Sequence, residues 1–124
     1  MGSRIKRDLV EVIEKDPNGL DPHDVGAKLD DTKIRSGLVL GSFANALEQV
    51  SRVGTFGAEK YSDNGWLEVP DGERRYTDAM LRHWLAEARG ELIDKDSRMF
   101  HAAQTSWNSL ARLELMMRRM KSDG

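Results

Sequence analysis

The sequence predicts an all-α protein, because its apolar residues follow a helical spacing and no segment shows the alternation of a strand. Apolar residues recur at intervals of three and four over long stretches, which is the spacing of one face of a helix. Clusters of glycine and proline separate these stretches, as expected between helices. No stretch alternates apolar and polar residues like a strand, and no repeat is visible. We therefore expect one helical domain over residues 1–124, with about five helices.

The first part of the chain predicts two short helices. Ile5, Leu9 and Ile13 share one helical face before the breaker sequence DPNG. In DPHDVGAKL, Asp21 can cap a second helix whose first residue is Pro22. The segment DDTKIRSG that follows is a polar connector.

A long helix is expected from Leu38 to Tyr61, because its apolar residues and glycines step by four and three along one face. Gly54 and Gly57 lie on that face, and each glycine costs roughly 1 kcal/mol of helix stability relative to alanine. Such glycines are useful where another helix or a ligand must approach the backbone closely. SDNGW ends this helix, and LEVPDGE is expected to be a loop.

Two further amphipathic helices complete the prediction. The first runs through RRYTDAMLRHWLAEARG and is closed by Gly90. The second begins at Asp96 or Ser97 and continues to about Met120. Its predicted core stripe consists of Met99, Ala103, Ser106, Leu110, Leu113, Met117 and Met120. Neighbouring apolar residues make this arc wider than a three-helix monomer can cover, so we expect a homo-oligomer.

The composition excludes several classes of protein. The chain has no cysteine, which excludes a disulfide framework, a thiolate nucleophile and sulfur-ligated zinc, and which fits a reducing, cytoplasmic setting. No apolar run approaches bilayer length, and the first residues lack the apolar core of a signal peptide. The formal net charge of −2 disfavours a broad nucleic-acid-binding surface.

The predicted last helix carries an unusual polar stripe. At helical spacing beside the apolar stripe lie four uncharged polar residues: His101, Gln104, Thr105 and Asn108. Elsewhere the expected exposed faces carry charged residues, so this stripe indicates either a partly buried, wet cleft or an ordinary solvated face that lacks charge.

Charged residues gather near the predicted helix ends. The candidate acids are Glu48, Glu59, Asp78, Glu91, Asp94 and Asp96, and the candidate cations are Lys33, Arg35, Lys60, Arg75 and Arg82. The acids could hold Mg²⁺ or Mn²⁺ or could be surface residues and helix caps. The cations could bind phosphates or simply flank helices. His83 is either a core histidine or a ligand, and Trp66 either stacks on a base or pins a loop.

A resemblance to a known family rests on the order of five segments: KLDDTKIR, LEQVSRVGTFGAEKY, NGW, RRYTDAMLRHWLAEARGELIDKDS and HAAQTSWNSLARLEL. From about Lys28 to Leu115 the chain resembles the phage-borne dATP/dGTP diphosphohydrolases, relatives of the MazG-like all-α nucleotide pyrophosphohydrolases. The resemblance implies a MazG-like helical bundle completed by oligomerisation, as a dimer or tetramer. It also implies hydrolysis of dGTP or dATP to the monophosphate and pyrophosphate with Mg²⁺ or Mn²⁺. In phages that replace adenine with diaminopurine, such an enzyme supplies dGMP to that pathway in the host cytoplasm.

Roles for individual residues follow from the resemblance. The residues expected to bind substrate are Lys33, Arg35, Lys60, Trp66, Arg82, His83, His101 and Asn108. We predict Glu48, Asp78 and Asp94 as the metal-binding and catalytic acids. Thr32 departs from the family, which usually has glycine there, and Gln104 stands where a second histidine is common. The paired acidic arrays of MazG proteins are absent in plain form.

The alternative function is a non-catalytic helical phage adaptor or a regulator that binds DNA. Its contacts would come from the two short basic segments RIKR and RRMK. Salt-sensitive DNA binding without nucleotide turnover would favour this alternative.

Overall fold

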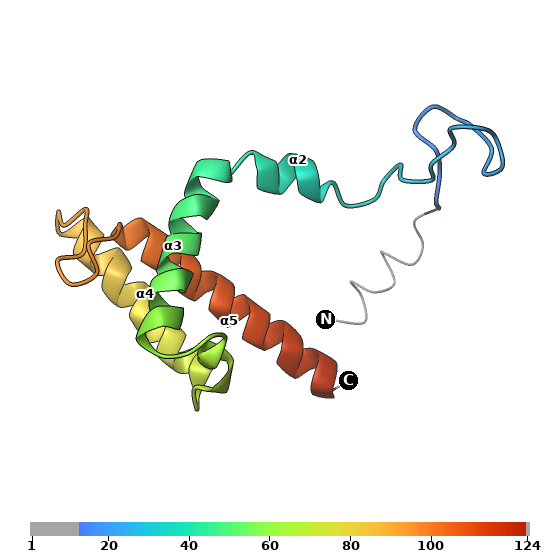
Figure 1. Cartoon of the computed structure of the whole chain (residues 1–124). Helices are drawn as coiled ribbons and strands as arrows, with labels where there is room; N and C mark the ends of the chain where they lie inside the picture. Colours follow the sequence, from blue (N-terminus) through green and yellow to red (C-terminus); the bar gives the residue numbers. More distant parts are fainter. Residues whose placement is uncertain (1–12, 124) are drawn as a thin grey trace. The chain divides into compact units, whose positions relative to one another are not determined.

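The computed structural model describes residues 13–123, whose regular secondary structure is helical (Figure 1). The elements in order are α2 (Ser36–Gly41), α3 (Ala44–Lys60), the 3₁₀ helix η1 (Gly65–Glu68), α4 (Gly72–Ala88) and α5 (His101–Asp123). Within the described range only isolated bridges occur in place of strands. The all-α prediction is confirmed. The predicted first helix, before DPNG, lies mostly outside the described residues, and residues 13–15, which are described, are not helical.

Among the helices of residues 13–123, none is long and apolar enough to cross a membrane.

The chain divides into two compact units between Ser42 and Phe43. In the first unit, the carboxylate of Asp16 is buried and accepts backbone N–H groups of Lys28 at 2.8 Å and Asn18 at 2.7 Å. The hydrogen bond from Lys28 is the main reason why the pKa of Asp16 is lowered. A buried carboxylate therefore closes the loop from Asp16 to Lys28.

The predicted second helix from Pro22 is wrong, because this segment forms turns. The side chain of Asp24 accepts the backbone N–H of Asp21 at 2.9 Å, which favours a local turn over a helix. Gly26 then adopts a φ of +85°, in the left-handed region that interrupts a helix.

The predicted helix from Leu38 to Tyr61 is interrupted, since α2 ends at Gly41 and α3 begins at Ala44. The hydroxyl of Ser42 donates to the carbonyl of Val39 at 2.7 Å. Such a bond competes with the helical ladder, and the glycine before Ser42 lowers the helix propensity further. The prediction is otherwise confirmed over α3.

The second unit, from Phe43 onward, is a packed group of helices, which we call the helical unit. α4 and α5 lie against one another, α3 contacts α5, and η1 contacts α4 (Figure 1). α4 ends as predicted, because Gly90 has a φ of +103° and its N–H donates to the carbonyl of Glu87 at 2.9 Å. The N–H of Glu91 donates to the carbonyl of Ala86 at 3.0 Å, which completes the Schellman pattern.

The predicted start of the last helix, at Asp96 or Ser97, is wrong, because α5 begins at His101. The preceding residues fold into a tight turn in which Asp94 N–H donates to the carbonyl of Met99 at 2.9 Å. Arg98 N–H donates to the carbonyl of Asp94 at 2.8 Å. Asp94 therefore closes a turn across the residues where the helix was expected to begin.

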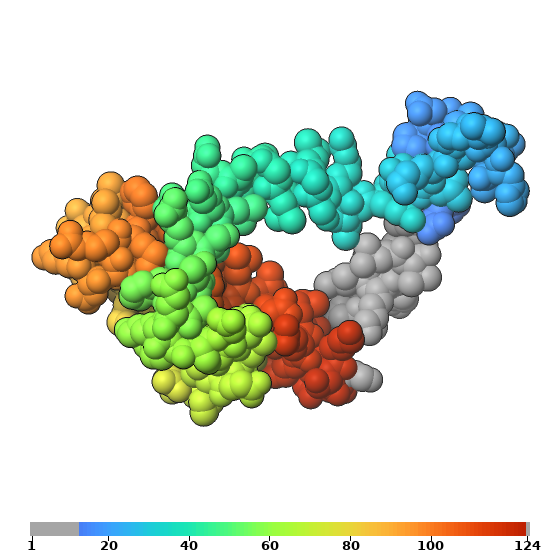
Figure 2. All heavy atoms as spheres, in the orientation of Figure 1, coloured from blue at the N-terminus to red at the C-terminus, as the bar shows by residue number. Residues whose placement is uncertain are grey.

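The predicted core stripe of α5 is confirmed at Ala103, which is buried, but is wrong over the C-terminal half of the helix within this chain. Its buried residues are His101, Ala103, Gln104, Asn108 and Ala111. Leu110, Leu113, Met117 and Met120 are instead 50%, 54%, 54% and 49% exposed. The C-terminal half of α5 forms part of the visible surface in the space-filling view (Figure 2). The side of α5 that packs on α4 therefore carries small and polar residues.

Candidate functional site

A cleft of about 1120 Å³ lies in the helical unit, lined by residues of α3, η1, α4 and α5. This volume slightly exceeds that of typical ligand clefts, which hold roughly 300–1,000 Å³. The residues that line it include Gly54, Gly57, Trp66, Arg74, Arg75, Asp78, Arg82, His83, Trp107 and Asn108. The cleft thus combines aromatic, cationic and neutral polar groups, which suits an anionic ligand with a flat ring.

Three aromatic rings form one wall of this cleft. Trp66, Tyr76 and Trp107 contact one another edge to face, with ring centroids 5.6 to 6.2 Å apart. The hydroxyl of Tyr76 donates to the carbonyl of Trp66 at 2.6 Å. Burial raises the pKa of this hydroxyl. Trp66 therefore pins its loop to the helices while it also borders the cleft.

The two glycines of α3 have different surroundings. A Cβ atom on Gly54 would lie 3.1 Å from Nε1 of Trp107, so this glycine lets the indole pack against the helix backbone. A Cβ atom on Gly57 would meet nothing within 4 Å, and Gly57 lines the cleft. Gly54 therefore serves packing, whereas Gly57 leaves open space.

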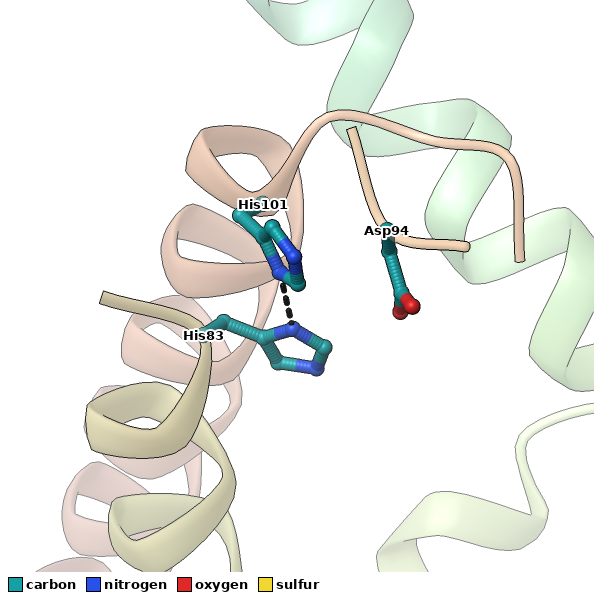
Figure 3. A group of neighbouring side chains, drawn as sticks. All are labelled: His83, Asp94 and His101. Atoms are coloured by element: carbon teal, nitrogen blue, oxygen red, sulfur yellow. Dashed lines mark hydrogen bonds between the residues drawn. The ribbon is translucent and has the colours of Figure 1, made fainter. Parts of the chain in front are cut away.

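Three side chains that could bind a metal ion converge beside the cleft: His83 of α4, Asp94 of the turn and His101 at the start of α5 (Figure 3). Their ligand atoms all lie within 4.8 Å of one another. In residues 13–123 no other group of three His, Cys, Asp or Glu side chains lies this close together. Nδ1 of His83 and Nδ1 of His101 are 2.8 Å apart. His83 also lines the cleft, so this group is joined to it.

Glu91 holds the ring of His101 from the other side. Its Oε1 is 2.7 Å from Nε2 of His101, whose side chain is only 5% exposed. This hydrogen bond is the main cause of the lowered pKa of Glu91. The sequence indicated Glu91 only as one of several acids, because the partners are ten positions apart and the turn that brings them together was not predicted.

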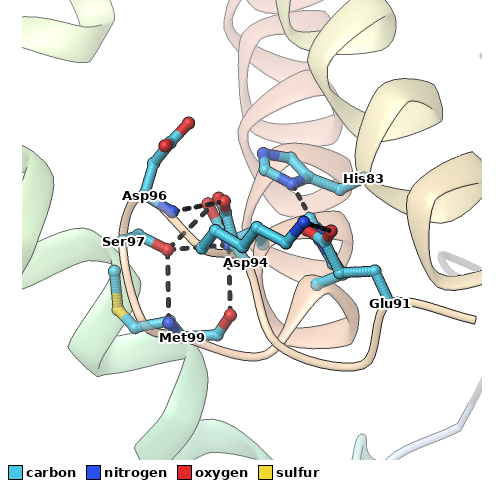
Figure 4. A network of polar contacts seen from close by, with 9 residues as sticks. His83, Glu91, Asp94, Asp96, Ser97 and Met99 are labelled. Atoms are coloured by element: carbon cyan, nitrogen blue, oxygen red, sulfur yellow. Dashed lines mark hydrogen bonds and ion pairs between the residues drawn. The ribbon is translucent and has the colours of Figure 1, made fainter.

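Asp94 is fixed by donors on several sides. It accepts hydrogen bonds from Ser97 Oγ at 3.3 Å and from the backbone N–H of Asp96 at 3.0 Å (Figure 4). Nε2 of Gln104 donates to it at 3.1 Å. Partial burial alone would raise the pKa of Asp94, but these hydrogen bonds together outweigh it and lower the pKa. Asp94 is consequently ionised at neutral pH.

The surroundings of His83 favour its neutral form. Its pKa is lowered first by burial and then by the neighbouring His101. A neutral imidazole and an ionised carboxylate are the forms that bind metal ions.

The polar stripe of α5 lies in a buried position, as the cleft interpretation predicted. His101, Gln104 and Asn108 are buried, and Asn108 lines the cleft. The amide of Asn108 donates to the carbonyl of Gln104 at 2.8 Å. The hydroxyl oxygen of Thr105 is buried and has no hydrogen-bond partner among the described groups. The alternative of an ordinary solvated face is therefore wrong.

The other predicted acids are not brought together with Asp94. Asp78 lines the cleft, is exposed and pairs with Arg74 at 3.3 Å. Glu48 is exposed on α3, where it pairs with Arg52 at 3.3 Å and borders a separate shallow depression. The metal-binding and catalytic roles of Glu48 and Asp78 stay predictions.

The predicted cations fall in different places. Arg82 lines the cleft together with Arg74 and Arg75, of which the sequence did not single out Arg74. Lys60 is exposed at the end of α3, with Nζ 5.3 Å from the ring centre of Tyr61.

Lys33 and Arg35 belong to the first unit. Lys33 pairs there with Glu14 at 3.3 Å, and Arg35 directly precedes α2.

The basic segment RRMK, near the end of α5, has both of its arginines bound to acidic side chains of the same chain. Arg118 contacts Glu114 at 2.8 Å, and Arg119 contacts Glu73 through two hydrogen bonds of 2.9 and 3.2 Å. This pairing weakens the case for a DNA-binding end. The other basic segment, RIKR, lies outside the described residues.

Comparison with known proteins gives one match. A sequence profile described as dATP/dGTP diphosphohydrolase, N-terminal, matches residues 23–124, which include the whole helical unit. No curated protein and no solved structure matches the chain.

Proposed function

Because the chain belongs to the dATP/dGTP diphosphohydrolase family, we propose that it hydrolyses purine deoxynucleoside triphosphates in the cleft of the helical unit. The proposed reaction is attack of water on the α-phosphorus, which releases dGMP or dAMP together with pyrophosphate. The main support from the structure is that aromatic rings, arginines and the His83–Asp94–His101 group adjoin a single cleft.

In this proposal the base lies near the aromatic wall and the phosphates lie near the arginines. Trp66 and Trp107 offer ring surfaces, and the amide of Asn108 offers hydrogen bonds to a purine edge. Arg82 and Arg75 contribute positive charge to the same cleft. Charge-assisted hydrogen bonds to phosphate are stronger than neutral ones, so these arginines would fix the position of the triphosphate.

The family resemblance implies a divalent metal ion, Mg²⁺ or Mn²⁺. His83, Asp94 and His101 fit a divalent ion, because their ligand atoms already lie within 4.8 Å of one another. When bound, such an ion supplies charge neutralisation and Lewis-acid activation for phosphoryl chemistry. Glu91 and Gln104 would keep the ligating side chains in place, since they hydrogen-bond His101 and Asp94.

We further propose a homo-oligomer, a dimer or tetramer, in which the exposed apolar side of α5 is covered by a second copy. Four large apolar residues on this side are about half exposed: Leu110, Leu113, Met117 and Met120. If the chain comes from a phage that replaces adenine with diaminopurine, the dGMP would supply that pathway in the host cytoplasm.

Incubation with dGTP, dATP, GTP and dCTP, followed by chromatography of the products, tests the proposed reaction. We expect dGMP and pyrophosphate from dGTP, and no product after chelation of divalent metal. Accumulation of dGDP and orthophosphate would contradict the assigned bond cleavage. Arg82→Gln should lower turnover, whereas Arg89→Gln, an exposed position at the end of α4 that does not line the cleft, should not.

A further inference from the structure

We propose that His83, Asp94 and His101 bind a divalent transition-metal ion in preference to Mg²⁺, and that Glu91 is the positioning residue for His101. The inference concerns the class of metal and goes beyond the proposed hydrolysis, since it holds whether or not a nucleotide is cleaved.

The donor atoms decide the class of metal. The group offers two imidazole nitrogens and one carboxylate oxygen. Mg²⁺ is bound by carboxylates, phosphates and water, and it dehydrates reluctantly. Imidazole suits Fe²⁺, Ni²⁺ and Zn²⁺, and two histidines with one carboxylate are typical of non-haem Fe²⁺ sites. This donor set therefore favours a transition-metal ion over Mg²⁺.

Glu91 determines which nitrogen of His101 is available. Because Nε2 is hydrogen-bonded to Glu91 at 2.7 Å, Nδ1 is the nitrogen that remains for a metal ion. That nitrogen faces His83, 2.8 Å away (Figure 3). A carboxylate behind a ligating histidine fixes the tautomer and the orientation of the ring, and it makes the nitrogen more basic.

The carboxylate of Asp94 is oriented before any ion binds. Gln104 and Ser97 donate to its Oδ2, and the backbone N–H of Asp96 donates to its Oδ1. The N–H of Asp94 also closes the turn through the carbonyl of Met99. A ligand held in this way loses little conformational entropy when it binds an ion, so the site is preorganised.

The contact between the two histidines is compatible with metal binding. One of the two Nδ1 atoms carries the proton of this hydrogen bond. An ion placed between the rings requires that proton to move to the other nitrogen of its ring. His83 permits this, because its ring is only half-buried and its described hydrogen bond involves Nδ1 alone. The contact between the two rings therefore does not exclude an ion between them.

Titration of the chelator-treated full chain with Co²⁺ tests the site directly. We expect visible d–d absorption that saturates at one Co²⁺ per chain and persists in a large excess of Mg²⁺. Asp94→Asn and His83→Gln should abolish this signal. Glu91→Gln should weaken Co²⁺ binding by about 10- to 100-fold. Helical circular dichroism of each variant shows whether the chain is folded.

Two matched controls sharpen this experiment. Asp96→Asn changes a nearby exposed carboxylate of the same turn, and His23→Gln changes an exposed histidine of the first unit. Both variants should bind Co²⁺ as the wild type does. If Mg²⁺ displaces Co²⁺ at equal concentration, or if folded Asp94→Asn retains full Co²⁺ affinity, the proposed site is wrong. Retained Co²⁺ binding without dGTP turnover would reject only the proposed hydrolysis.

Discussion

The two sides of α5 bury and expose opposite kinds of residue. The side that packs on α4 buries neutral polar residues, and His101, Gln104 and Asn108 are 4%, 8% and 7% exposed. On the other side, Leu113 and Met117 are each 54% exposed. Each residue of an α-helix is rotated by about 100° from the one before it, which places these two sets on nearly opposite sides of α5. The two sides are therefore distinct surfaces.

Only the apolar side is expensive by the usual rules of folding, because an exposed leucine or methionine forgoes roughly 25 cal/mol for each Å² of apolar surface left in water. A buried polar group costs free energy unless it is hydrogen-bonded, and His101, Gln104 and Asn108 all have partners within the chain. A second copy of the chain would explain the apolar side, whereas the polar side adjoins the cleft in which we propose that the ligand binds. The comparison therefore separates a ligand surface from a partner surface on one helix.

The largest effect is expected on the apolar side. Leu113→Glu should raise the dissociation constant of the oligomer by about 30-fold or more, because an unpaired carboxylate at an interface centre costs on the order of 2–4 kcal/mol. Light scattering over a range of concentrations measures this constant. Leu92→Glu is the control, since Leu92 is similarly exposed at 57% but lies outside α5. If the wild-type protein is a monomer at micromolar concentration, the proposed partner surface is wrong.

On the polar side, Gln104→Leu should lower the free energy of unfolding by about 1–3 kcal/mol. The change keeps most of the volume but removes the amide that donates to Asp94 and Ser97 at 3.1 Å each. Urea denaturation measures the loss. Gln49→Leu, at a position on α3 with no side-chain hydrogen bond among those described, should change stability much less. Equal effects of the two changes would show that the network does not hold the turn.

The glycines of α3 test how closely α5 approaches this helix. Gly54→Ala should destabilise the helical unit by about 1–3 kcal/mol, because its Cβ atom would press on Trp107 at 3.1 Å. Gly57→Ala should leave stability unchanged or raise it by up to roughly 1 kcal/mol, the usual gain in helix propensity. Thermal unfolding distinguishes the two variants. If both are equally stable, Trp107 does not pack as described.

The smallest effect is expected at Thr105, whose buried hydroxyl oxygen has no partner among the described groups. Thr105→Val keeps the shape and removes the unsatisfied group, so stability should rise by up to about 1 kcal/mol. The measurement is again urea denaturation. A loss of stability would mean that the hydroxyl has a partner such as a buried water, and the polar side would then be fully satisfied without a ligand.

The sequence predicted those parts of the fold that depend on local spacing. The periodicities of α3 and α4, and the left-handed glycine that ends α4, are properties of neighbouring residues. The start of α5 was mispredicted, because Asp94 and Ser97 suit both a helix cap and a tight turn, and tertiary contacts decide between them. The apolar stripe of α5 was found, but amphipathicity alone does not tell whether its own chain or a partner covers it.

The candidate site could be predicted only in part for the same reason. The polar stripe was visible as a local pattern, and its burial was one of two interpretations. The pairing of His83 with His101 joins residues 18 positions apart on different helices. That pairing depends on how α4 packs on α5, which no local pattern encodes.

The placement of the ligand on the polar side can be measured with the three tryptophans of the chain. Trp66 and Trp107 line the cleft, whereas Trp84 is 54% exposed on α4 and does not line it. Titration of ¹⁵N-labelled protein with a dGTP analogue whose α,β-bridge is a methylene group resolves one indole N–H signal for each tryptophan. We predict that the signals of Trp66 and Trp107 shift and saturate together while that of Trp84 stays in place. A shift of Trp84 alone, or saturable binding that leaves all three signals unchanged, would contradict a nucleotide site in this cleft.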